Sequence, residues 1–257
     1  MASLCQEVSL AANMLTRLPI KEFRQENWVK LPVKRGFTRK PASDIRGDNL
    51  NNFMLDGVPT VRPYGIPLLQ PCCDVPLQII SFSEAVSSRK PDKETWVHFF
   101  EDDYKFQQLW NKPRKYLPII QRYGGAIMSD FSTHENLQLY QQITNAGRNF
   151  QIGAWLQHEG VKVIGSSRWN GPGTEDWSTA GLPLESSIFL SIHGMNHDDW
   201  SRSRVRCEIQ YLLEEKHPKN LLIYGNVKHL HLDRELVGEA NVFMYEPDTW
   251  RRSGVRL

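Results

Sequence analysis

Residues 96–169 read WVHFFEDDYKFQQLWNKPRKYLPIIQRYGGAIMSDFSTHENLQLYQQITNAGRNFQIGAWLQHEGVKVIGSSRW. Three apolar runs lie in this stretch, at 96–100, 126–128 and 161–164, and two segments with helix-like spacing separate them. Such alternation is typical of parallel strands joined by crossover helices. Ligands of these folds gather at the carboxyl ends of the strands. We therefore expect the functional residues directly after the three runs.

The alternation continues outside this stretch. Further apolar runs occupy 77–82, 187–192, 221–224 and 241–245, and residues 201–216 have helical spacing. The sequence thus predicts an α/β fold with a mainly parallel sheet and crossover helices. The sheet is either open and doubly wound or barrel-like. Short strands that end in polar residues, as at a barrel rim, favour the barrel-like form.

The first 50 residues differ from the rest. Residues 1–18 have the spacing of a short helix that Pro19 would end, and residues 1–43 carry eight Lys or Arg against three acidic residues. We expect an N-terminal helix and basic arm at 1–50 and a single α/β domain at 51–257. A basic arm can contact phosphate, and a solvated surface accounts for it equally well. Residues 52–57 predict a short strand, and the proline-rich residues 57–76 predict an ordered segment without regular structure.

The bulk composition excludes several classes of protein. The net charge of +2 argues against a strongly basic nucleic-acid binder. Since no apolar run reaches about 18 residues, we expect no transmembrane helix, and the N-terminus lacks an apolar signal-peptide core. The four cysteines form no Cys-x-x-Cys pair, so we expect reduced thiols in a cytosolic protein.

Three aspartates are the candidate catalytic residues. Asp102 and Asp103 follow the run at 96–100, and Asp130 follows the run at 126–128. A carboxylate among apolar neighbours has a raised pKa, which suits a general base or a metal ligand. The alternatives are a helix cap and, for Asp130, an ion pair with Arg148 or Arg168.

The candidate ligand-binding residues follow the second and third runs. Asn145 and Arg148 share one face of the helix expected at 135–159, and Gln157 lies on the same segment. Arg148 could bind phosphate or carboxylate through its guanidinium, or pair internally with Asp130. Arg168 and Trp169 could hold a nucleotide by charge and stacking, or Trp169 could be a rim or core residue.

His193 is a further ligand-binding candidate. It stands before His197 and Asp199, which are residue types that bind divalent metals. The spacing matches no known metal motif, so no metal site is predicted, and a loop that caps the helix at 201–216 is the alternative. The sequence also lacks a P-loop, a GxGxxG fingerprint, a GxSxG elbow and a zinc-finger spacing. No cofactor is assigned.

Several motifs in this order resemble one domain family. They are HFFEDDYKF at 98–106, SDFS at 129–132, Gln157 with Gly160, Trp169, IHG at 192–194 and YG at 224–225. The chain resembles, over roughly residues 50–245, an uncharacterised family of domains of unknown function found in phages, prophages and bacterial mobile elements. The resemblance implies a phage or mobile-element origin, a location in the cytoplasm of the bacterial host, and no particular activity.

These observations lead to two hypotheses of function. In the first, a polar pocket at the strand carboxyl ends binds or processes a nucleotide or nucleic-acid component. Asp130 is then the base, Asp102 or Asp103 assists, and Arg148 and Arg168 hold the anionic group. In the second, the chain is a non-enzymatic phage protein that inhibits a host defence or replication protein. Convergence of Asp130, Arg148 and Arg168 in a deep cleft would favour an enzyme. Pairing of these residues with each other, together with a flat aromatic patch elsewhere, would favour the interaction protein.

Overall fold

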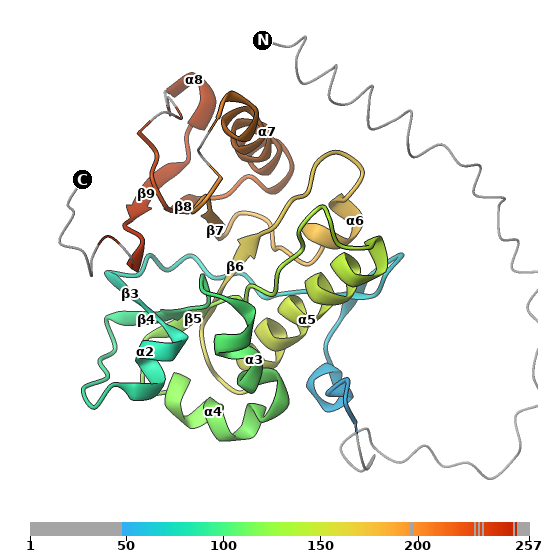
Figure 1. Ribbon diagram of the computed structural model, residues 1–257, viewed down its shortest axis with the longest axis vertical. Coiled ribbons are helices and arrows are strands. Elements are labelled where there is room, and N and C mark those ends of the chain that lie inside the picture. The colour runs from blue at the N-terminus through green and yellow to red at the C-terminus, as the bar shows by residue number, and fades with distance from the viewer. Residues whose placement is uncertain are drawn as a thin grey trace, which may run out of the picture.

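The structure, a computed structural model, describes residues 48–195, 198–228, 230, 232, 234–248 and 250, without the side chains of residues 234 and 235 (Figure 1). The N-terminal helix and most of the arm expected at 1–50 lie outside the described residues. Within them, seven strands form one sheet in sequence order: β3 (Gln78–Ser81), β4 (Thr95–His98), β5 (Gly125–Ile127), β6 (Val163–Ser167), β7 (Ser187–Ser191), β8 (Asn220–Tyr224) and β9 (Asn241–Tyr245).

Every neighbouring pair of strands in this sheet is parallel, as the alternation predicts. The sheet curls into a half-barrel, which confirms the α/β class and the mainly parallel sheet. The hydroxyl of Tyr245 on β9 donates to the carbonyl of Pro76, just before β3, at 2.7 Å. This bond joins the two ends of the curled sheet, which lie on the same side of the molecule in Figure 1.

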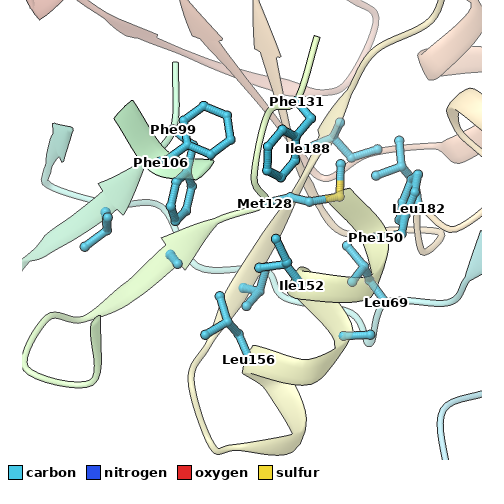
Figure 2. Close-up of a cluster of buried hydrophobic side chains, with 14 of the residues drawn as sticks. Leu69, Phe99, Phe106, Met128, Phe131, Phe150, Ile152, Leu156, Leu182 and Ile188 are labelled. Carbon is cyan, nitrogen blue, oxygen red and sulfur yellow. The ribbon is translucent and has the colours of Figure 1, made fainter. Parts of the chain in front are cut away.

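The helices follow the strands: α2 (Phe82–Ser87), α3 (Asp103–Asn111), α4 (Pro113–Ile120), α5 (Leu139–His158), α6 (Glu175–Ser178), α7 (Asp199–Lys216) and α8 (Arg234–Val237). One face of the sheet packs on helices and holds the main core, which includes Val97, Met128 and Leu190. Figure 2 shows part of it between α5 and the sheet. The opposite, concave face holds a second core from alternate strand positions, such as Trp96, Ile164 and Phe189.

Helix α5 runs without interruption through both of its glycines. Gln138 and Gln141 form a capping box at its start, which satisfies backbone donors that the first turn leaves unpaired. Gly153 lies where a Cβ atom would come within 3.0 Å of Leu69 Cδ2. A larger residue would therefore force the Leu69 side chain to shift.

The proline-rich segment closes the amino end of the half-barrel. The backbone N–H of Leu69 donates to the carbonyl of Gly181, and Cys72 exchanges two hydrogen bonds with the side chain of Ser186. The hydroxyl of Ser187, at the start of β7, donates to the carbonyl of Asp74. The proline-rich segment therefore covers the amino end of the sheet.

Some local predictions were wrong. Residues 52–55 form the 3-10 helix η3 (Asn52–Leu55) rather than a strand, and the proline-rich segment contains a short antiparallel pair, β1 (Thr60–Val61) with β2 (Ile66–Pro67). Strand β6 extends through Ser167 instead of ending at Ile164. The helix α2 was missed, although Ser81 caps it by accepting from the backbone of Glu84. None of the described helices combines the length and apolar character needed to cross a membrane.

Candidate functional site

The loop after β5, residues 129–133, is fixed by side chains from several elements. Asn149 of α5 accepts from Phe131 N at 2.7 Å and donates to Phe131 O at 3.0 Å. Asp103 of α3 accepts from the backbone N–H and the hydroxyl of Ser132, and Asn145 donates to Ser132 O. These hydrogen bonds therefore hold Asp130, the residue between Ser129 and Phe131, in one position.

The side chain of Asp130 is 2% exposed. Arg168, directly after β6, donates from Nε and Nη2 to the two carboxylate oxygens. This geometry confirms the expectation that a desolvated Asp130 has an arginine partner. Burial raises the pKa of the Asp130 carboxyl, and the Arg168 guanidinium opposes that rise.

Glu208 of α7 fixes the other side of the pair. Its Oε1 accepts from the hydroxyl of Ser167 at 2.6 Å and from the backbone N–H of Trp169 at 3.2 Å. It thus holds the residues on both sides of Arg168. Glu208 is itself buried, and desolvation raises the pKa of its carboxyl. We expect its role to be the placement of Arg168, since both bonds are to the turn that carries it.

His98 ends β4 at the same end of the half-barrel and is completely buried. Its Nδ1 accepts from the backbone N–H of Phe100 at 3.2 Å, so the proton of a neutral ring is on Nε2. Nε2 lies 3.3 Å from a carboxylate oxygen of Asp248, but no hydrogen bond of acceptable geometry forms there.

Ser166 of β6 carries another buried polar atom without a hydrogen-bond partner among the described residues. Its Oγ makes no hydrogen bond within the described part of the chain. Ser166 pairs in register with Phe189, which belongs to the concave core. His98, Asp130, Ser166 and Arg168 together are called the mouth cluster below.

The remaining aspartate candidates are placed differently from expectation. Asp102 stands at the N-terminus of α3 without a side-chain capping bond, is 64% exposed and pairs with Lys105. It is therefore a surface residue, and its placement argues against the catalytic role expected of it. Asp103 supports the loop through Ser132 rather than facing a ligand. Adjacent side chains at a strand-to-helix turn point apart, which explains the divergence.

Arg148 was expected to bind an anion or pair with Asp130, and the pairing is wrong, because Asp130 pairs with Arg168 instead. Its guanidinium lies over the rings of Phe131 and Trp110, 3.9 and 4.6 Å from their centroids. It donates to Asn145 Oδ1 and Gln107 Oε1, and its Nε has no hydrogen-bond partner among the described residues. Arg148 and Asn145 thus brace the loop instead of reaching the mouth cluster.

Three other ligand-binding candidates also lie apart from the mouth cluster. Trp169 is 7% exposed and stacked on Tyr211, so its ring faces are not open to a base. Gln157 binds both backbone groups of Gln70, near the segment that closes the amino end. His193 is exposed on a turn and contacts Tyr224 edge-on at 6.0 Å.

The histidine-rich stretch after β7 gives no metal site in the described residues. Asp199 is 99% exposed and pairs with Arg202, and His197 lies outside the described residues. No group of three or more His, Cys, Asp or Glu side chains that could hold a metal ion occurs within the described ranges.

The sequence analysis assigned no role to His98, Ser166, Glu208 or Asn149. Their positions carry only weak signals, because a polar residue inside an apolar strand can be recognised only once the face it points to is known. His98 breaks the apolar run at 96–100, and this was the one available signal.

Comparisons with known proteins place the chain in a wider group. The family described as "Domain of unknown function (DUF4417)" matches residues 58–243, which include the whole mouth cluster. The Gene 1 protein of Mycobacterium phage D29 is 30% identical over 178 residues, 66% of this chain and 64% of that protein. The Gene 1 protein of Mycobacterium phage L5 is 30% identical over 167 residues, 65% of this chain and 73% of that protein. No solved structure matches the chain.

Proposed function

This chain belongs to the DUF4417 family of phage-related domains of unknown function, and we propose that it binds a phosphate-bearing ligand, a nucleotide or a nucleic-acid end, at its mouth cluster. The proposal rests on one observation: His98 Nε2 and Ser166 Oγ are both buried at the carboxyl end of the sheet without a hydrogen bond among the described residues. Buried polar atoms are rarely left unsatisfied unless a ligand or a functional constraint accounts for them.

The charge at the site supports an anionic ligand. Arg168 uses Nε and Nη2 for Asp130, and its Nη1 has no hydrogen bond to a described residue. The Arg168 side chain is 25% exposed, so a ligand can reach it. A guanidinium held by a carboxylate is already oriented, which lowers the entropy lost when an anion binds.

Aromatic rings lie beside His98. The ring of Phe100, which is partly exposed, lies 5.4 Å from the His98 ring and 4.8 Å from the Tyr224 ring. Aromatic side chains next to a cationic group are the usual contacts of nucleotide bases. This neighbourhood favours a nucleotide over inorganic phosphate as the ligand.

The geometry favours binding over the catalytic role first expected of Asp130. Both carboxylate oxygens of Asp130 accept from Arg168, so the group is occupied as a positioning residue rather than available as a base. His98 cannot accept a proton at Nδ1 without losing its bond from Phe100 N. The proposed ligand would instead accept hydrogen bonds from Arg168 Nη1 and His98 Nε2.

Isothermal titration calorimetry of the full chain tests the proposal. The probes are inorganic phosphate, nucleoside mono- and triphosphates, and a short single-stranded oligonucleotide. Ser166→Ala removes an unpartnered hydroxyl and should not lower the melting temperature, yet it should weaken binding about five- to ten-fold through one lost hydrogen bond. The matched control is Ser87→Ala, at an exposed position of α2, and it should leave the affinity unchanged. Absence of binding to every probe by the wild-type chain and by the Asp248→Asn and Tyr245→Phe variants introduced below would refute the proposal.

A second candidate function has its own observation. Val75, Leu77, Phe243 and Met244 are 36–69% exposed, and the Tyr245–Pro76 bond brings the two segments that carry them together. Exposed apolar patches mark protein interfaces, which fits inhibition of a host protein. Under this function, none of the phosphate-bearing probes binds. The double variant Leu77→Lys with Met244→Lys should abolish a purified complex with a host protein. The control variant Leu139→Lys should leave that complex intact.

A further inference from the structure

The chain crosses the mouth of the half-barrel directly after β9. Residues 246–248, called the strap below, follow Tyr245, whose carbonyl accepts from Gly225 N at 3.1 Å. The backbone N–H of Asp248 donates to the hydroxyl of Tyr224 at 3.0 Å. Pro247 is buried, and the Asp248 side chain is 13% exposed. The strap therefore lies against the carboxyl end of the sheet rather than in solvent.

The strap brings a carboxylate to the mouth cluster. Asp248 Oδ2 lies 3.3 Å from His98 Nε2, the only nitrogen of this ring that can donate when it is neutral. The two atoms are close enough to attract each other but do not form an aligned hydrogen bond. An acceptor that approached Nε2 along the N–H direction would form a stronger contact than Asp248 does.

A second anion cannot share this position with Asp248. Nε2 carries one proton, so it donates to one acceptor at a time. Two negative groups that share one poorly solvated position repel each other strongly. Occupation by the strap carboxylate and by a ligand phosphate are thus mutually exclusive.

We infer that Asp248 is an internal competitor, which occupies the anion position at His98 and is displaced when the phosphate-bearing ligand binds. This inference rests on the proposed function and adds its regulation: the strap sets the affinity of the mouth cluster. Anything that lifts the strap, such as a partner that takes up the C-terminal end, would raise ligand affinity.

The test compares Asp248→Asn with wild type by calorimetry, using inorganic phosphate and the nucleoside monophosphates as probes. Asparagine keeps the shape of the side chain but removes the competing charge. If the coupling free energy between the strap and the ligand is of ordinary size, the dissociation constant of Asp248→Asn should be at least about five-fold lower than that of wild type. Asp199→Asn, which removes an exposed carboxylate on α7, is the matched control and should bind as wild type does.

Tyr245→Phe provides an independent variant that keeps Asp248. It removes the bond to Pro76 and so loosens the strap, and it should also bind more tightly than wild type. It replaces Asp248→Asn if that variant does not fold.

The outcomes separate the two proposals. Binding by wild type with equal or weaker affinity in both strap variants would overturn the strap inference and leave the proposed function standing. Binding by the strap variants alone would support both, because the strap would then block the site fully. No binding by any of the proteins would overturn both.

Discussion

Asp130→Asn is the most informative single substitution for the buried ion pair. Asparagine has nearly the same size as aspartate but no charge, and its amide group replaces one acceptor by a donor. One of the two Arg168 nitrogens would then face an N–H group instead of an oxygen. The guanidinium would also lose the carboxylate that neutralises it.

The expected cost follows from how deeply the pair is buried. Removal of one partner of a buried ion pair costs about 3–5 kcal/mol. Asp130 is 2% exposed, but Arg168 is 25% exposed and also attracted to Glu208, so water and that carboxylate offset part of the loss. We therefore take the lower bound, about 3 kcal/mol, which lowers the melting temperature of a domain of this size by about 6–12 °C.

Thermal unfolding followed by circular dichroism measures this shift. Asp102→Asn is the matched control, because Asp102 is 64% exposed and its pair with Lys105 is on the surface. A surface pair contributes about 1 kcal/mol or less, so the control should melt within about 3 °C of wild type. The double variant Asp130→Asn with Arg168→Gln should recover part of the loss, since neither charge then lacks its partner.

An Asp130→Asn protein that melts as wild type does would refute this reasoning. The ion pair would then add nothing to stability, and Asp130 of the wild-type chain would again be a candidate base. A large drop in both Asp130→Asn and Asp102→Asn would point to a general sensitivity of the α3 region instead.

The remaining predictions concern the pH dependence of stability, the contact between Gln157 and Gln70, and the N-terminal arm. Burial raises the pKa of Glu208, so the folded state holds that proton more tightly than the unfolded state, and wild type loses stability as the pH rises from the ordinary pKa of glutamate through the raised value. Glutamine does not titrate, so the melting temperature of Glu208→Gln minus that of wild type should grow over this pH range, and a constant difference would contradict the prediction. Gln157→Ala removes the bonds to both backbone groups of Gln70 and should cost about 1–2 kcal/mol in denaturant unfolding, while the affinity measured by calorimetry stays unchanged. Deletion of residues 1–45 should leave a core that still unfolds cooperatively, and a broad, non-cooperative melt would show that the arm belongs to the core.

The candidate site was only partly predictable from the sequence. Asp130 and Arg168 could be found because each lies a few residues after an apolar run, and parallel strands bring such positions to one edge of the sheet. Asp102, Gln157 and Trp169 were chosen by the same rule or by residue type. The rule cannot say whether a side chain after a strand points to the mouth, to a helix or to solvent, because a turn of one residue reverses its direction.

The sequence alone determined the class of the fold. The alternation of short apolar runs with helical segments can be recognised from the local periodicity of the sequence. Because parallel strands need crossover connections, this order of elements led to one parallel sheet with helices packed on it. Only the tertiary structure decided which polar residues meet. The curl of the sheet brings Asp248 to His98, 150 positions earlier in the chain, and pairs Asp130 with Arg168 while Arg148 stacks on Phe131. These contacts depend on which face each strand residue occupies and on how far the sheet bends, and neither quantity is encoded in a local pattern of residues.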